Sequence, residues 1–279
     1  MQARSTQAAA EKVTHMDNLV GITLSKADMV ALVSGVRVAM SRDTTRPNLC
    51  GIHVSNDGEQ LAFAATDGHR LHAAYVERAV KGEAPAVDAV IPSEGVEKLM
   101  AAWKPLKRHK RLTLAFDGAR FLTETDADGV VAVDRMIFDA VEGFPNWRKI
   151  LPERRDRPPT AVDPLLDHLG RFHALRGFIK LSSGPASQQA QHRWTLTLLH
   201  WDGSRADWTR GDGFEARAVL TGPLGFEPFG VNPKLLADAL RFAVGDLRHL
   251  HFQPGDGKSP IRVASLDDAR VAVVMPAKL

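Results

Sequence analysis

The sequence predicts an α+β fold built from two similar units, and two observations lead to this prediction. The first is an internal repeat of about half the chain, in which a helix, several strands, a second helix and further strands appear twice in the same order. Residues 91–96 (IPSEGV) and 231–236 (VNPKLL) mark the same place in each half, where a strand enters a helix that starts at a proline. The second is that the strands follow one another, which is typical of antiparallel sheets covered by helices on one face. This order disfavours a parallel, dinucleotide-binding sheet.

In the first half, a helical spacing of apolar residues begins at Leu24 and continues to Met40, with Ser25 as its N-cap. Apolar and polar residues then alternate, which predicts strands, and residues 56–58 (NDG) predict a turn between the first two. Residues 92–94 (PSE) open a second helix. The strands are expected at residues 52–55, 61–65, 71–76, 89–91, 112–116, 120–125 and 130–135.

The second half repeats this order after a segment rich in proline and charge. Helices are expected at residues 162–175 and from Val231 onward, and strands at residues 194–199, 214–220, 248–252, 261–264 and 270–275. A chain of 279 residues is long enough for two domains of ~100–150 residues. The predicted organisation is a flexible arm at 1–20, a first domain at 21–153, a linker at 154–160 and a second domain at 161–279.

Composition places the chain among ordinary globular proteins, with 44% hydrophobic and 25% charged residues. No run of about 18 uncharged apolar residues occurs, which excludes a membrane-spanning helix. The first residues lack the apolar core of a secretory signal. The lone Cys50 can form no intrachain disulfide and no thiolate zinc site. We therefore expect a cytoplasmic protein without membrane contact.

The net charge of +3 favours nucleic acid as a partner. Basic residues gather at 104–111 and at 148–157. Solvated surface and linker are the alternative interpretation of both clusters.

Residues that could carry catalysis or bind a metal are few, because no P-loop, dinucleotide fingerprint or metalloprotease motif occurs. Asp67 and His69 lie close enough in sequence for a carboxylate to orient an imidazole, although Asp-Gly is also common in turns. His249 and His251 share one face of a predicted strand and could hold a metal, with an ordinary surface pair as the alternative. These residues leave a hydrolase or a metal enzyme as an alternative function.

Two segments place large apolar residues where polar ones are usual. Residues 144–152 (FPNWRKILP) mix apolar and basic side chains just before the linker, and residues 273–279 (VVMPAKL) stay apolar to the end of the sequence. They either complete the core between the domains or form an apolar groove with a basic rim, suited to a short peptide with apolar anchors.

These segments and two others resemble one known family. Residues 66–71 (TDGHRL) resemble a signature of the bacterial DNA polymerase III beta subunit, the sliding clamp. Residues 46–52 (RPNLCGI), 144–152 and 273–279 resemble further segments of that family in the same order. The resemblance runs from about residue 20 to the end and covers the family's middle and C-terminal domains, while the N-terminal domain has no counterpart in this sequence.

The resemblance implies a processivity factor, with no catalytic residues, cofactor or metal. In such clamps the helices line a ring around duplex DNA, without sequence preference, and the sheets lie outside. DNA polymerase, clamp-loader and repair proteins insert short peptides between the middle and last domains. Because six domains close a ring, two domains in a chain favour a homotrimer over a dimer or a monomer. The alternative is an adaptor or regulator that keeps only the peptide pocket and does not encircle DNA.

The resemblance also assigns residues to these roles by position. The peptide pocket is expected to comprise Leu49, Thr66, Gly68, His69, Arg70, Leu71, Pro145, Lys149, Ile150, Asn232, Pro260, Val273, Met275, Pro276, Ala277, Lys278 and Leu279. Its apolar walls are expected from Leu71, Ile150, Val273 and Met275, and its partner-facing cations from Arg70, Lys149 and Lys278. The DNA-facing cations are expected to be Lys26, Arg37, Arg42, Arg46, Lys104, Lys107, Arg171, Lys234 and Arg241.

Overall fold

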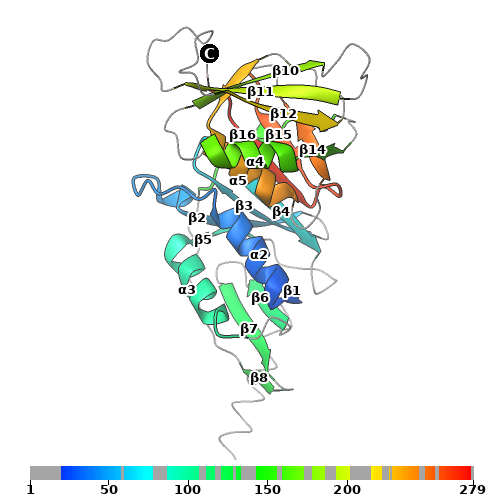
Figure 1. The fold of residues 1–279 in the computed structure, drawn as a ribbon. Coiled ribbons are helices and arrows are strands. Elements are labelled where there is room, and N and C mark those ends of the chain that lie inside the picture. Colours follow the sequence, from blue (N-terminus) through cyan, green and yellow to red (C-terminus); the bar gives the residue numbers. More distant parts are fainter. Residues whose placement is uncertain are drawn as a thin grey trace, which may run out of the picture. The chain divides into compact units, whose positions relative to one another are not determined.

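The computed structural model of the protein describes residues 20–57, 60–77, 87–106, 111–116, 121–127, 130–132, 143–155, 159–172, 178–185, 193–201, 215–221, 226, 228–244, 249–254 and 258–277. The chain forms two compact units, drawn in Figure 1. Unit 1 comprises Met1–Ala65 and Ala74–Pro145, and unit 2 comprises Thr66–Ala73 and Asn146–Leu279. The strand β4 (Arg70–Glu77) crosses this division. The domain boundaries expected at residues 153–161 stay a prediction.

The described residues of unit 1 include the α-helices α2 (Lys26–Arg37) and α3 (Ser93–Trp103), which pack against each other. The expected cap of α2 is confirmed, because the hydroxyl of Ser25 accepts a hydrogen bond from the Asp28 N–H. The start expected at Leu24 is wrong, since β1 (Val20–Ser25) precedes the helix directly. Val20 was also assigned to the flexible arm, whose other residues lie outside the described part.

The strands of unit 1 form antiparallel sheets. One sheet has the order β1-β6-β7-β8, and the strands β5-β2-β3 pair in a second. Gly51 is required where β2 meets β5, because a Cβ there would lie 2.3 Å from the Ile91 carbonyl oxygen. The bounds are β2 (Gly51–Asp57), β3 (Gln60–Thr66), β5 (Asp88–Pro92), β6 (Arg111–Phe116), β7 (Phe121–Ala127) and β8 (Val130–Ala132), with a 3-10 turn η1 at Pro47–Leu49.

Unit 2 contains the helices α4 (Asp163–Phe172) and α5 (Pro233–Val244), which lie side by side (Figure 1). One sheet has the order β12-β11-β10-β13, and the strands β16-β15-β14-β9 pair in another. The helix α5 packs on β14, β15 and β16, whereas α4 packs on β12. The bounds are β9 (Thr160–Ala161), β10 (Phe178–Pro185), β11 (Arg193–Trp201), β12 (Glu215–Thr221), β13 (Phe229–Val231), β14 (His249–Gln253), β15 (Ile261–Ala264) and β16 (Arg270–Val274).

The predicted fold class is confirmed, since in the described part of each unit α-helices pack on antiparallel strands. The sequence missed β10, and it placed the first residue of β9 in the linker. Leu165, Leu169, Leu236 and Leu240 are buried, so the apolar faces of α4 and α5 supply the core of unit 2. No helix among the described residues is long and apolar enough to cross a lipid bilayer.

Candidate functional site

Unit 2 contains a surface cavity of about 490 Å³. Its lining comes from the last residues of the turn η2 (Trp147–Ile150) and the segment after it, from the end of β14 and the loop before β15, and from Met275 after β16. The cavity is lined by Lys149, Ile150, Leu151, Pro152, Glu153, Arg154, Arg155, Gln253, Pro254, Ser259, Pro260 and Met275. Its volume lies in the range of typical ligand sites, about 300–1,000 Å³.

Two exposed apolar side chains line this cavity. The large hydrophobic residues exposed in the described part of the chain are Val38, Ile150, Leu266 and Met275, and two of them meet here. Ile150 is 46% exposed and Met275 is 41% exposed. Because such side chains lose their contact with water when a ligand covers them, the cavity can bind an apolar group.

The buried side chain of Trp147 anchors the turn η2. Trp147 is only 2% exposed, and the guanidinium carbon of Arg148 lies 4.5 Å from the centre of its ring. Three residues further along the turn, Ile150 faces the cavity. The burial of Trp147 therefore fixes the position from which Ile150 is presented.

Gln253 holds the segment 153–155 against the end of β14. Its amide nitrogen donates to the Glu153 carbonyl oxygen and its amide oxygen accepts from the Arg155 N–H, each at 2.9 Å. Gln253 is 7% exposed, so its amide satisfies two backbone groups in a largely buried place. One side chain thereby fixes the backbone of the basic wall.

A carboxylate also ties this wall to the turn between β15 and β16. Asp268 accepts from Arg154 Nη1 at 2.6 Å and from Arg262 Nη2 at 2.9 Å. The turn is shaped by its neighbour, because the Ser265 hydroxyl and the Ala269 N–H both donate to Asp267 Oδ1. These hydrogen bonds, of which that from the Ser265 hydroxyl has the largest effect, hold the pKa of Asp267 below its usual value.

Backbone hydrogen bonds on two sides hold the segment that contains Met275. The Met275 N–H donates to the His69 carbonyl oxygen, and the Ala277 N–H donates to the Gly230 carbonyl oxygen, both at 2.8 Å. Met275 is therefore fixed through its backbone while its side chain stays exposed. An unbranched thioether on a fixed backbone suits apolar groups of varied shape.

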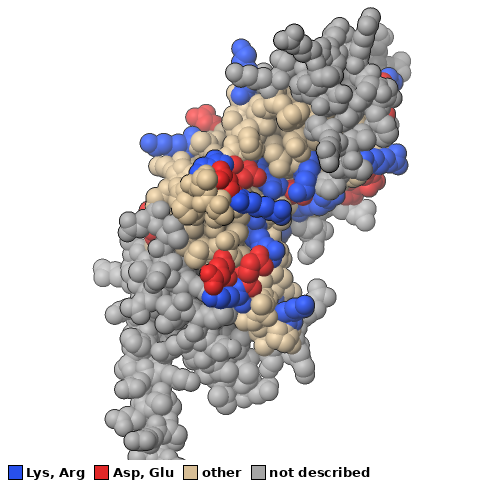
Figure 2. Space-filling model, turned by 90° about the vertical axis from the view of Figure 1, so that its left-hand side faces the viewer, with Lys and Arg blue, Asp and Glu red and all other residues tan. Residues whose placement is uncertain are grey.

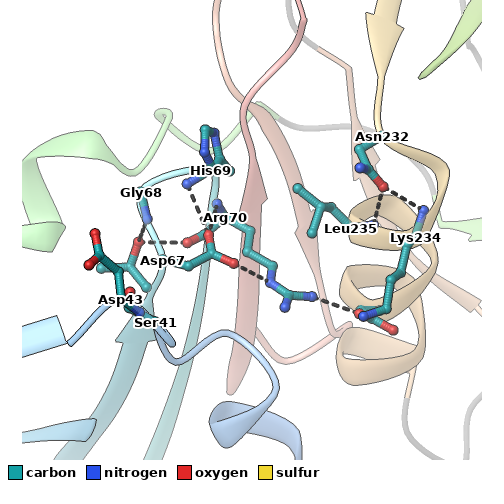
Figure 3. A network of polar contacts seen from close by, with 11 residues as sticks. Ser41, Asp43, Asp67, Gly68, His69, Arg70, Asn232, Lys234 and Leu235 are labelled. Carbon is teal, nitrogen blue, oxygen red and sulfur yellow. Dashed lines mark hydrogen bonds and ion pairs between the residues drawn. The ribbon is translucent and has the colours of Figure 1, made fainter. Parts of the chain in front are cut away.

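Residues 66–70 form a tight turn closed by its own side chains (Figure 3). Gly68 has φ +90°, a conformation that favours glycine, and its N–H donates to the Thr66 hydroxyl. Asp67 Oδ1 accepts from the backbone N–H groups of His69 and Arg70, which is an Asx-type turn. The carboxylate of Asp67 thus acts on the backbone, as the turn interpretation of this sequence predicts.

Arg70 joins this turn to α5. Its Nε donates to Asp67 Oδ2 at 3.0 Å, and its Nη1 donates to Asp238 Oδ2 at 2.6 Å (Figure 3). The Arg70 side chain is 8% exposed. We expected Arg70 to face a partner, but two carboxylates of its own unit already bind its guanidinium. Charge pairing inside the unit is the reason for this difference.

The histidines that could have held a metal lie on β14, where His249 is exposed and His251 is half-buried. Within the described ranges, no three His, Cys, Asp or Glu side chains gather in a way that could hold a metal ion.

Comparisons with known proteins point to one family. Residues 23–135 match the sequence model of the DNA polymerase III beta subunit, central domain. The chain is 26% identical over 275 residues to the beta sliding clamp of Synechococcus elongatus, a match that covers 92% of this chain and 65% of that protein. It is 28% identical over 141 residues to the Escherichia coli K12 beta sliding clamp, covering 50% and 35% of the two chains. The chain is therefore similar to the beta sliding clamps.

A solved structure has the same fold. The sliding clamp of Pseudomonas aeruginosa matches with a TM-score of 0.72 and 19% identity, covering 93% of this chain and 67% of that one. The chain spans 35% to 65% of the length of the two curated clamps named above.

The pocket residues expected from the clamp resemblance fall into distinct environments. Lys149, Ile150, Pro260 and Met275 line the cavity. Five others are buried, namely Leu49, Thr66, Arg70, Leu71 and Val273. Asn232 caps α5, because its side-chain oxygen accepts from the N–H groups of Lys234 and Leu235. Gly68, His69 and Pro145 are exposed, Pro276 and Ala277 are half-buried, and Lys278 and Leu279 lie outside the described residues.

Several cavity residues were not foreseen. The sequence analysis assigns Arg154 and Arg155 to a linker, and it gives no role to Gln253 and Pro254, which follow the strand expected at residues 248–252. The only local signal was the cluster of basic residues at 148–157. No spacing rule connects Glu153 with Gln253, because the two meet only in the folded unit.

The expected DNA-facing cations lie on or beside the helices of both units, apart from Lys107, which lies outside the described residues. Four of them bind groups of their own unit. Lys26 donates to the carbonyl oxygens of Lys104 and Leu106. The three arginines form ion pairs, Arg37 with Glu97, Arg46 with Asp43, and Arg241 with Asp238. The others are exposed: Arg42, Lys104, Arg171 and Lys234. Figure 2 shows basic and acidic side chains intermixed on the described part of one face. On that face, positive charge is interrupted by acids.

Proposed function

We propose that the protein is a non-catalytic DNA sliding clamp, which retains a partner protein on duplex DNA by binding a short peptide of that partner. The observation that carries this proposal is the meeting of Ile150 and Met275, both exposed and apolar, in one cavity of unit 2. The relation to beta sliding clamps supports the same activity. The proposed partners are DNA polymerase and clamp-loader subunits.

A peptide suits this cavity better than a small polar metabolite. Leu151, Pro152, Pro254 and Pro260 add apolar lining around the exposed side chains. A leucine or phenylalanine of a peptide would cover Ile150 and Met275, whereas the peptide backbone would stay near the polar rim. We include Leu71 and Val273 in the proposed site as buried support, since their side chains are 0% and 1% exposed.

Replacing Met275 by alanine is expected to weaken the binding of a clamp-type peptide by about 1–3 kcal/mol, the loss typical of an apolar anchor that becomes buried on binding. Fluorescence anisotropy with a labelled peptide containing leucine and phenylalanine measures this. Leu266→Ala is the matched control, because Leu266 is 37% exposed outside the cavity. Equal affinities of the Met275→Ala variant and the unaltered protein would rule out the assignment of the cavity.

We propose that DNA is held by encirclement rather than by tight contact. The exposed cations Arg42, Lys104, Arg171 and Lys234 would attract phosphates without reading bases. Three further cations, Arg37, Arg46 and Arg241, already pair with acids, which weakens their contact with phosphates and suits a protein that slides. The helices would then face the DNA and the sheets would lie outside.

We further propose that three chains close the ring, because three copies of a chain with two such units supply six clamp domains. Light scattering over a range of concentrations is expected to give a species of three times the 30.5 kDa chain. Such a ring should also stay on closed circular DNA and leave it after linearisation. A stable monomer that binds peptide but is not retained on circles would favour the adaptor, which uses only the pocket.

A further inference from the structure

We infer that the cavity selects peptides in which acidic residues flank the apolar anchor. This inference rests on the proposed peptide-binding function and adds the chemistry of the partner to it. It is carried by the charges of the wall formed by residues 149–155 and by the way that wall is held.

Positive charge dominates the cavity lining. Among the described lining residues, Lys149, Arg154 and Arg155 stand against one acid, Glu153. All four are exposed to solvent. Asp268 and Arg262, which form ion pairs next to this wall, do not change its net charge, because they add one charge of each sign. The described lining residues therefore carry an excess of two positive charges.

The cations differ in how free they are to meet a ligand. Arg154 already shares Asp268 with Arg262, and its side chain is 56% exposed. Lys149 and Arg155 are the exposed cations of the wall that lie outside this carboxylate network. We therefore assign the contacts with acidic side chains to Lys149 and Arg155.

The backbone at Arg155 is held in place before any peptide arrives. Gln253 binds the Glu153 carbonyl oxygen and the Arg155 N–H, and Asp268 binds the Arg154 guanidinium. A charge on a fixed backbone loses less conformational entropy on binding than a charge on a mobile loop. Substitution of the Arg155 side chain leaves the hydrogen bond of its N–H in place, which makes it a clean test position.

The cavity also excludes a simple anion as its main occupant. Ile150 and Met275 offer apolar surface next to the cations, and a phosphate or a free carboxylate would leave that surface exposed to water. An acidic peptide with an apolar residue satisfies both parts of the lining. Charge complementarity across such a rim also speeds association and weakens with salt.

The test compares two labelled peptides of equal length with leucine and phenylalanine at the centre. One carries Asp and Glu on both flanks, and the other carries Asn and Gln at the same positions. With the full chain at low salt, we expect the acidic peptide to bind about 3- to 10-fold more tightly, as two exposed ion pairs would give. The advantage should shrink as salt is raised and vanish in a Lys149→Gln/Arg155→Gln double variant.

Arg217→Gln is the matched control, because Arg217 is 70% exposed on β12 outside the cavity and should leave the preference unchanged. Equal binding of both peptides, with affinity still lost in Met275→Ala, would overturn this inference and keep the proposed function. An acidic preference that persists in the double variant would also overturn it, because the acids would then bind elsewhere. Failure of both peptides to bind would overturn the proposed function itself.

Discussion

Replacing Arg70 by methionine is expected to lower the free energy of unfolding by about 3 kcal/mol or more, as removal of one partner from a buried ion pair does. The guanidinium is 8% exposed and binds two carboxylates, those of Asp67 and Asp238, which are 20% and 16% exposed. Without it, two partly buried acids keep their charge and lose their partner. Urea unfolding of the variant and the unaltered protein measures the difference.

The control is the exposed pair of Arg217 and Glu215, whose side chains are 70% and 41% exposed. Arg217→Met should cost less than about 1 kcal/mol, the usual size for surface pairs. Adding Asp67→Asn and Asp238→Asn to Arg70→Met should restore part of the loss, because the unpaired charges are then gone. A similar cost for Arg70→Met and Arg217→Met would show that burial does not set the strength of the Arg70 network.

Replacing Trp147 by alanine is expected to cost about 3–5 kcal/mol of stability, as deletion of a large core side chain usually does. Trp147 is 2% exposed and is the first residue of the turn whose last residue is Ile150. The same substitution should weaken peptide binding, because the turn η2 would lose its anchor. Thermal unfolding and peptide anisotropy on the same samples measure both effects.

Ile150→Ala separates the two effects of Trp147→Ala. Ile150 is 46% exposed, so this substitution should change stability by less than about 1 kcal/mol and still weaken peptide binding. If Trp147→Ala unfolds at the temperature of the unaltered protein, Trp147 does not anchor the turn.

Local sequence patterns predicted most of the fold because they report local physics. Ser25 was recognised as a cap because a hydroxyl just before an apolar-periodic segment satisfies a free N–H of the first turn. The expected helix at 162–175 is α4 (Asp163–Phe172), followed by residues outside the described part. In these places, spacing and capping residues point to one structure.

Sequence patterns did not predict the strands β1 and β10, which are held by pairing with distant strands. The helical spacing expected from Leu24 overlaps the end of β1, a strand in which Val20, Ile22 and Leu24 alternate with smaller or polar residues and which pairs along its length with β6. The strand β10 (Phe178–Pro185) ends in small and turn-forming residues that do not mark a strand, yet it pairs with both β11 and β13. In β10, long-range hydrogen bonds override weak local preference.

The sequence by itself predicted the α+β class with two units and offered a turn as one interpretation of residues 66–69, while the clamp resemblance assigned Ile150 and Met275 to a peptide pocket. Only the tertiary structure decided that Leu71 is buried, that Arg70 is bound by Asp67 and Asp238, and that Gln253 fixes the backbone at 153–155. The reason is physical. Turns and helix caps depend on neighbours in sequence, whereas burial and charge pairing depend on groups that folding brings together from distant parts of the chain.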